Sequence, residues 1–397
     1  IAVPTYWTLP GEKMEIIFDH PTPLGTLGPL PRLLQSLVPF AAEFDQLVLV
    51  AAPTGPGLSE RLEEQLREFL AGAALPYPIL VVGPTQVARL RHFCQEQGQE
   101  EFAPLLSLSG YGATRNLTLA LANLLGAELL LCLDDDELVV ETDFFRQVKQ
   151  DFWELSARYD SFGLAGLYLN PDGSLAAPEP VEPWAQAWPK MRWLNEAVAR
   201  LAAGKDLVPT PLALGGNMAF CRSLYLKIPF DPLILRGEDI DYVLNAKFFG
   251  IPFFLDPRLR VVHDPPPKPH PVWLRLRLDL QRFVYTRQKL RGQRPEPGLV
   301  SVTAVELQPY PGNFLGDDLD LLAYRSHTLL ALAYLEQGEA EAARETLANL
   351  TCLEQLPNPD RTFTAYLELT RRWRCLQTWL TQPEIRTAAL GLLEGEG

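Results

Sequence analysis

Apolar runs alternate with amphipathic segments along the first two-thirds of the chain. Continuous apolar stretches at 1–6, 46–52, 78–82 and 128–133 predict strands, because strands buried on both faces are apolar throughout. Between these runs, apolar residues recur with helical spacing at 27–40, 58–73, 85–97 and 114–125. The alternation predicts an α/β fold whose parallel sheet is covered by helices on both faces.

The pattern loosens after this part of the chain. A strand is expected at 163–169, followed by a turn in which Pro171 fixes φ, Asp172 bonds its own backbone and Gly173 is permissive. The Pro- and Trp-rich stretch up to 189 is expected to be an irregular functional surface. A helix at 240–249 and a strand at 260–262 complete the predicted α/β part.

The last third is predicted to be helical. The proline-rich segment 264–271 cannot form a helix, and 272–291 has the pattern of a basic amphipathic helix. Helical spacing at 319–335, 339–350 and 363–379 predicts a small α-helical domain that contains one tetratricopeptide-like helix pair.

Composition narrows the class of protein. The 397 residues exceed the usual size of one domain, and a net charge of −14 argues against a general nucleic-acid partner. Five scattered cysteines without a CxxC pair indicate reduced thiols in a cytoplasmic protein. There is no apolar run of about 18 residues, so no membrane-spanning helix is expected.

The basic helix at 272–291 has two interpretations. It could lie on an anionic membrane surface, as a peripheral contact that presents a site to a lipid. We prefer the second interpretation, in which the helix packs across its own domain and its basic side chains are solvated or paired with the acidic remainder. Formation of a homo-oligomer stays open.

Three carboxylates follow the strand at 128–133. In an extended chain, Asp134 and Asp136 point to the same side, while Asp135 turns aside. Carboxylates at the carboxyl edge of an α/β sheet suit Mg²⁺ or Mn²⁺, which binds substrate phosphates. Taken alone, the same residues fit an acidic turn or a helix cap equally well.

Other polar motifs surround this one in the sequence. Gly110 and Gly112 open a helix that carries Arg115, a donor suited to phosphate oxygens. Gly215 and Gly216 would let a sugar approach the backbone. Further along the chain, Glu238 and Asp239 begin a helix, where one carboxylate could act as a general base or both could cap the helix. His263 ends the strand that follows.

This order of motifs resembles the GT-A glycosyltransferases, in particular the family 2-like members, over about residues 1–264. The resemblance implies a GT-A fold with a nucleotide-binding half at about 1–137 and an acceptor half at about 138–265. It implies that Asp136 and His263 bind the metal ion and that Asp239, with Glu238, is catalytic. The residues that it implies for the nucleotide sugar are Pro4, Thr5, Tyr6, Arg115, Asp134, Asp135, Gly216 and Asn217.

The resemblance predicts a metal-dependent transferase that moves a sugar from a UDP- or GDP-sugar to a hydroxyl acceptor, either a small molecule or a glycan. Many family 2 members have an acidic residue after the second strand, but residues 48–55 (VLVAAPTG) contain none, so the nucleobase stays open. The spacing to Glu238 and His263 also resembles retaining enzymes that glycosylate glycerate or phosphoglycerate. A nucleotidyltransferase is disfavoured, since residues 3–14 lack its Gly-rich loop. The remaining alternative is a non-catalytic scaffold that works through the C-terminal helices.

The predicted domains are therefore a glycosyltransferase domain at 1–265, a linker with the basic helix at 266–315, and a helical domain at 316–397. Lys268 and His270 in the linker are expected to reach a diphosphate as a lid. Trp184, Trp188 and Trp193 either stack on an acceptor sugar or close the core.

Overall fold

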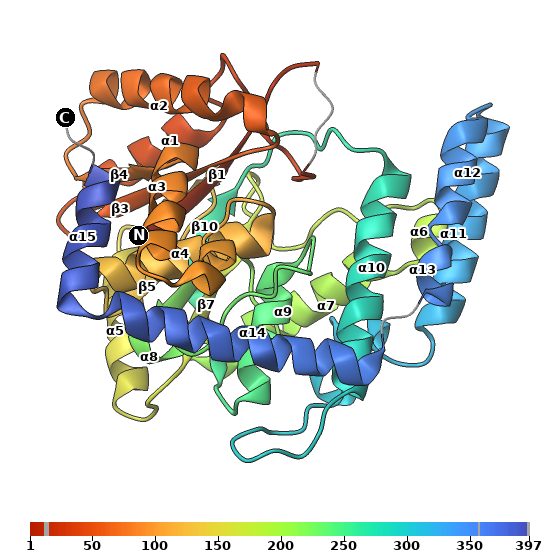
Figure 1. The fold of residues 1–397 in the computed structure, drawn as a ribbon. Coiled ribbons are helices and arrows are strands. Elements are labelled where there is room, and N and C mark those ends of the chain that lie inside the picture. The colour runs from red at the N-terminus through yellow and green to blue at the C-terminus, as the bar shows by residue number, and fades with distance from the viewer. Residues whose placement is uncertain (12–15, 356–357, 395–397) are drawn as a thin grey trace.

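The computed structural model describes residues 1–11, 16–355 and 358–394, and its centre is one mixed β-sheet (Figure 1). The strands are β1 (Ala2–Thr8), β2 (Thr22–Pro23), β3 (Leu47–Pro53), β4 (Ile79–Val82), β5 (Leu129–Cys132), β6 (Glu137–Leu138), β7 (Gly163–Leu169), β8 (Val208–Pro209), β9 (Met218–Cys221) and β10 (Phe253–His263). Their order is β4-β3-β1-β5-β9-β7-β10-β6, with β2 beside β1 and β8 beside β10.

Helices cover the sheet and form the C-terminal third. Those in the first two-thirds are α1 (Leu30–Ser36), α2 (Ser59–Ala73), α3 (Pro84–Glu96), α4 (Tyr111–Leu125), α5 (Phe144–Ser156), α6 (Pro183–Ala187), α7 (Lys190–Ala202), α8 (Arg222–Tyr225) and α9 (Glu238–Phe248). The others are α10 (Val272–Arg291), α11 (Leu319–Glu336), α12 (Ala340–Ala348), α13 (Thr351–Glu354), α14 (Pro359–Leu380) and α15 (Pro383–Glu394). The predicted α/β class with C-terminal helices is confirmed.

Strand direction brings distant segments to one edge of the sheet. β1, β3, β4 and β5 are mutually parallel, and β9 runs antiparallel between β5 and β7. β10 is parallel to β7. The carboxyl ends of β1, β5, β7 and β10 therefore meet at the edge where β9 begins, as α/β sheets arrange their ligand-binding edge.

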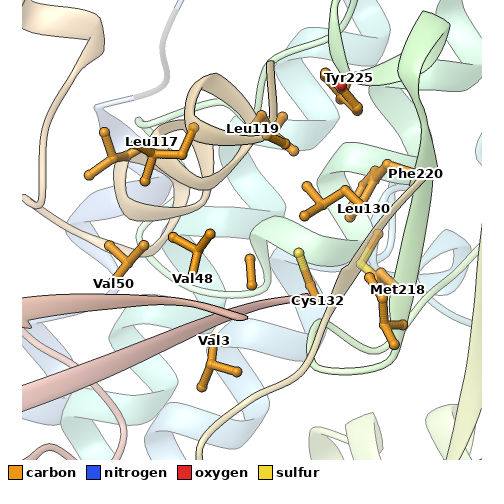
Figure 2. Close-up of a cluster of buried hydrophobic side chains, with 14 of the residues drawn as sticks. Val3, Val48, Val50, Leu117, Leu119, Leu130, Cys132, Met218, Phe220 and Tyr225 are labelled. Carbon is orange, nitrogen blue, oxygen red and sulfur yellow. The ribbon is translucent and has the colours of Figure 1, made fainter. Parts of the chain in front are cut away.

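The core beside this edge consists of apolar strands and the helix α4. Almost every residue of α4 is buried, which is expected for a helix that is apolar on most of its circumference. Figure 2 shows Leu117 of α4 over Val48 and Val50 of β3, with Cys132 of β5 nearby. This packing holds the first turn of α4, and with it Arg115, against the sheet.

The final helices return to the first part of the chain. Trp373 of α14 is fully buried and donates to the Tyr225 carbonyl (2.9 Å), while Trp379 packs on Phe93 and Phe102. In Figure 1, α14 crosses the molecule between α10 and α15, and α11 to α13 stand beside α10. The domain boundaries at 265 and 315 stay predictions, but residues of α14 and α15 belong to the core that the sheet forms.

The basic helix α10 packs inside the protein. Its Lys289 and Arg287 are buried, and most of its cations have partners within the chain: Arg277 with Glu345, Arg282 with Asp279, Arg287 with Asp320, Lys289 with Asp231 and Asp241, and Arg291 with Asp317. These contacts fit the interpretation in which the helix packs across its own domain. None of the helices in the described ranges is long and apolar enough to cross a membrane.

The prediction of an irregular stretch up to 189 was wrong in one place. Pro183 occupies the first turn of α6, where its missing N–H is not needed and its fixed φ suits a helix. α5 and α7 were missed by the sequence interpretation.

Candidate functional site

The candidate site lies at the shared edge of the sheet. It contains the ends of β1, β5 and β10, the segment before β9, and the first turns of α4 and α9. Parallel strands separated widely in the sequence place their terminal side chains together here, so the motifs that were predicted from their order meet in space.

Arg115 joins the two acidic motifs. Its Nη2 donates to both oxygens of Asp134 (2.9 and 3.3 Å), and its Nε donates to Glu238 Oε1 (2.7 Å). Nη1 donates to the Gly215 carbonyl (3.1 Å). Because the guanidinium is buried, these charge-assisted bonds fix the distance between the sheet edge and the start of α9. Contact of Arg115 with a nucleotide stays a prediction.

Asp135 lies in a turn that follows β5, in which the Glu137 N–H donates to the Asp134 carbonyl (3.2 Å), so the alternation expected of an extended chain does not apply here. Asp135 accepts a hydrogen bond from Thr5 Oγ1 of β1 (2.5 Å), so two predicted site residues stabilise each other. Burial, reinforced by the neighbouring Asp136, raises the pKa of Asp135 well above its ordinary value. Thr5 thereby connects the end of β1 to the end of β5.

Asp136 is a buried carboxylate with almost nothing to neutralise it. His20 Nε2 and His263 Nε2 approach the same oxygen, Oδ2, at 3.2 and 3.4 Å. Neither carboxylate oxygen has a hydrogen-bond partner in the part of the chain that the structure describes. Burial alone would raise the pKa of Asp136, but the two imidazoles bring it below its ordinary value.

This donor set fits a divalent cation. An orphaned carboxylate between two imidazoles offers the oxygen and nitrogen ligands that Mn²⁺ accepts, and Mg²⁺ is commonly bound by one or two carboxylates together with substrate phosphates. Across residues 1–11, 16–355 and 358–394, no group of three or more His, Cys, Asp or Glu side chains is placed to hold a metal ion by itself. Phosphate oxygens would therefore have to complete the coordination.

Glu137 stabilises the acidic loop that contains Asp134, Asp135 and Asp136. It is fully buried, and its Oε2 accepts the Asp134 backbone N–H (3.0 Å). Burial, together with Asp134 and Asp136, raises the pKa of Glu137 well above its ordinary value. A Cβ at Gly216 would lie 2.0 Å from Glu137 Oε1, which explains why glycine occurs there.

Glu238 and Asp239 form the opposite wall of the site. Burial raises the pKa of Glu238 to about 7, against the opposing effect of Arg115. Asp239 accepts from the backbone N–H groups of Gly215 (3.0 Å) and Ile240 (2.8 Å), and burial raises its pKa as well. Asp239 thus lies in the first turn of α9, whose N-cap is Gly237, and presents a more basic carboxylate than an exposed aspartate.

An aromatic wall follows β1. Tyr6 stacks on Phe18 with ring centroids 4.1 Å apart, and both meet the edge of Tyr111. The Tyr6 hydroxyl is buried without a hydrogen-bond partner in the described ranges. Pro4 lies inside β1, paired in register with Val50. The predicted contact of Pro4, Thr5 and Tyr6 with a nucleotide is untested, but Tyr6 offers an unused polar group next to stacked rings.

Two predicted residues have structural contacts of their own. The buried Asn217 side chain donates to the carbonyls of Leu167 and Leu259, which ties β7 to β10. The backbone N–H of Gly216 donates to the Tyr168 hydroxyl (2.7 Å). A contact of Gly216 and Asn217 with a donor sugar therefore stays a prediction.

The tryptophans predicted for the acceptor side pack in one core cluster. Trp188 and Trp193 pack on Phe314 with centroids 4.6 and 4.7 Å apart, and so close a core cluster. Trp184 packs against the same cluster and, like Trp188, lines a cavity together with Lys268. His270 Nε2 lies 2.6 Å from the Phe18 carbonyl and is buried.

Several site residues gave no signal in the sequence. Asp19 and His20 occupy a loop without periodicity, so only the fold brings them to Asp136 and to the cations around Arg236. Glu137 directly follows the three aspartates and could have been included with them. Arg236 precedes Gly237, whose φ of 74° marks a turn that only glycine adopts readily.

Comparisons with known proteins place similar structures among sugar transferases. No protein-family model matches the chain, and no curated protein matches it. A mannosyltransferase from Pyrobaculum calidifontis, solved with GDP-Man and Mn²⁺, is 15% identical with a TM-score of 0.44, over 96% of this chain and 88% of that one. TarS from S. aureus is 13% identical with a TM-score of 0.43, over 95% of this chain and 54% of that one.

A third similar structure is glucosyl-3-phosphoglycerate synthase from Mycobacterium tuberculosis, solved with Mn²⁺, UDP and phosphoglyceric acid. It is 14% identical with a TM-score of 0.38, over 75% of this chain and 80% of that one. Glycosyltransferases are thus among the structures similar to this chain, in agreement with the resemblance found in its motifs. At these identities and TM-scores, the chemistry of this chain has to be argued from its own residues.

Proposed function

We propose that this protein is a metal-dependent glycosyltransferase that moves a sugar from a nucleoside-diphosphate sugar to a hydroxyl acceptor. The observation that supports this most strongly is Asp136, a buried carboxylate without a hydrogen-bond partner in the described ranges, flanked by His20 and His263 at the ligand-binding edge of the sheet. Two further carboxylates, Glu238 and Asp239, begin α9, and Arg115 joins Glu238 to Asp134 of the acidic loop.

The residues divide the binding work between them. Asp136 and His263 would hold Mn²⁺ or Mg²⁺, with His20 on the same oxygen of Asp136. A bound divalent cation would neutralise the charge that develops on the departing diphosphate. Tyr111, which is partly exposed and packs edge-on against the buried Tyr6 and Phe18, offers a ring for contact with a nucleobase.

In the inverting form of the reaction, Asp239 accepts the proton of the acceptor hydroxyl. That oxygen then forms a bond to the anomeric carbon, while the bond from this carbon to the diphosphate oxygen breaks. The pKa of Asp239 is raised by burial, so its carboxylate is a stronger base than an exposed one. Glu238, held by Arg115, positions the first turn of α9.

A retaining reaction is the second candidate. It is favoured by the fact that both oxygens of Asp239 already accept backbone N–H groups, as expected for a carboxylate that positions rather than deprotonates. The anomeric configuration of the product, determined by NMR, distinguishes the two reactions.

A thermal-shift screen tests the proposal. UDP-, GDP-, ADP- and TDP-sugars are compared with and without Mn²⁺, since a donor that binds the folded protein raises its melting temperature by mass action. We expect one nucleotide to give a metal-dependent shift that Asp136→Ala abolishes. Asp143→Ala, which removes an exposed carboxylate, is the matched control.

Two outcomes would overturn the proposal. If no sugar nucleotide shifts the melting temperature and none is turned over with metal, a scaffold role through the C-terminal helices becomes the better explanation. If Asp136→Ala keeps the full metal-dependent shift, the metal ion is bound elsewhere.

A further inference from the structure

A cavity of about 310 Å³ lies beside the candidate site, a volume suited to a small molecule. One wall is apolar and includes Trp184, Val272 and Leu276. The other wall carries basic side chains from three separate segments, namely Lys190 of α7, Arg236 before α9, and Lys268 of the linker. Arg275 of α10 also lines the cavity, and its buried Nε has no hydrogen-bond partner in the described part of the chain.

The carboxylates that contact these basic side chains are fewer than the side chains themselves. Lys190 and Arg236 contact Asp279 (2.7 and 3.2 Å), while Arg236 and Lys268 contact Asp19 (both 2.8 Å). Arg282 also contacts Asp279 (3.5 Å). In this network, four cationic groups contact two carboxylates, so cations outnumber carboxylates among its mostly buried groups. Glu179 and Glu182 also line the cavity, but both are exposed to solvent.

Such an excess is unfavourable unless an anion shares it, since desolvated like charges repel each other. The pKa of Lys190 agrees with this: burial, together with Arg236 and Arg282, lowers it to about 7 against the opposing effect of Asp279. By contrast, Lys289 is fully buried between Asp231 and Asp241, with no excess of cations, and burial has not lowered its pKa below the ordinary value.

The network is continuous with the candidate site. Asp19, which receives Arg236 and Lys268, is followed directly by His20, which approaches Asp136. On the other side, Gly237 packs so closely on Arg282 that a Cβ would lie 1.6 Å from its Nη1, and Glu238 and Asp239 come next in the chain. The cavity wall at Arg236 is therefore three residues along the chain from Asp239, the carboxylate proposed as the base.

We propose that this cavity is the acceptor pocket and that the acceptor carries an anionic group, a carboxylate or a phosphate, which binds among Lys190, Arg236 and Lys268. This proposal rests on the proposed function in one respect, namely that the bound molecule is the acceptor of the sugar. The anion site itself does not depend on the proposed function. The apolar wall of Trp184 and Leu276 would face the uncharged part of the molecule.

Isothermal titration calorimetry with inorganic phosphate, in EDTA and without any sugar nucleotide, tests the anion site alone. We expect saturable binding that Lys268→Met weakens about tenfold or more, since a charge-assisted hydrogen bond to the anion is lost. Arg236→Met should weaken binding at least as much. If the Arg236 variant does not fold, Lys268→Met still tests the site, because Lys268 lies on the exposed linker. Lys149→Met removes one surface cation elsewhere and is the matched control.

Glucose, glucuronate and glucose 6-phosphate then distinguish the anionic groups on one skeleton. Stronger binding of one charged sugar identifies a carboxylate or a phosphate, while glucose should bind more weakly than either. The proposal is overturned if phosphate does not bind saturably, if glucose binds as well as the charged sugars, or if Lys149→Met weakens binding as much as Lys268→Met. If the protein binds phosphate but binds none of the sugar nucleotides, the anion site is supported and the proposed function is contradicted.

Discussion

Two buried charged regions lie next to each other with opposite imbalances. At the sheet edge, Asp134, Asp136 and Glu238 share one buried cation, Arg115, and two imidazoles. In the adjoining cavity, four cationic groups share Asp19 and Asp279. Since a folded protein rarely buries uncompensated charge, each region indicates the ligand that would complete it: a cation in the first and an anion in the second.

The largest expected effect comes from removing the one buried cation of the acidic region. Arg115→Met leaves Asp134 and Glu238 without their partner, and we expect the free energy of unfolding to fall by about 3–5 kcal/mol. Urea unfolding followed by circular dichroism measures this loss. Lys268→Met should lower it by less than about 1 kcal/mol, because this side chain is partly exposed and Asp19 keeps Arg236. Equal losses would mean that the two regions do not differ in this way.

Asp136→Asn should separate the two regions by ligand. The affinity for Mn²⁺ in the presence of the donor nucleotide is expected to fall at least about tenfold, because a neutral amide replaces the carboxylate. The affinity for phosphate measured in EDTA should stay unchanged. Titration calorimetry gives both numbers, and a parallel loss of phosphate binding would show that the regions form one site.

Asp279→Asn should enlarge the imbalance in the cavity. Lys190, Arg236 and Arg282 would lose a carboxylate, so phosphate should bind several-fold more tightly while the free energy of unfolding decreases. Asp317→Asn removes an exposed carboxylate from the surface and serves as the control. Weaker phosphate binding by the Asp279 variant would contradict a cationic excess.

The smallest expected effect is the uptake of protons when an anion binds in the cavity. Burial lowers the pKa of Lys190 to about 7, so this amine is partly neutral between pH 7 and 8. An anion beside Lys190 favours the charged form and raises its pKa, so binding should take up a fraction of a proton in this range. Below about pH 6 the amine is already charged, and the uptake should disappear.

Titration of sulfate, which stays a dianion throughout this range, in buffers of different ionisation enthalpy measures this uptake. Asp279, Arg236 and Arg282 are the charged groups that face Lys190, and they keep their charge throughout this range. Lys190→Met should abolish the uptake while the folded structure is retained. Proton release on binding would contradict the assignment.

The acidic region could be predicted from the sequence and the cationic region could not. The aspartates follow an apolar strand at the carboxyl edge of the sheet, and the order of motifs, with the resemblance that it carries, placed His263 beside them. The cavity instead assembles single cations from a linker, a loop and two helices, with no local pattern to mark them. Lys268 was expected to reach a diphosphate, whereas its observed partner is Asp19.

The periodicity of the sequence also could not predict side-chain contacts that depend on tertiary packing. Arg115 was expected to contact phosphate, but its guanidinium lies between two carboxylates that only the fold brings together. The boundaries of α10 were predicted correctly from its spacing, while the burial of Lys289 depends on Asp231 and Asp241, which belong to other segments.

The return of α14 and α15 to the sheet has a consequence for biosynthesis. Trp373, Trp379 and Leu393 fill the same apolar core as strands that precede them by more than 200 residues and are synthesised earlier, such as β1 and β3. While these residues are still inside the ribosome, the nascent sheet exposes the surface that they will cover. Contacts between residues so far apart in the sequence slow folding, and they prolong the time during which aggregation-prone intermediates are exposed. The growing polypeptide is therefore expected to depend on chaperones until α15 has emerged.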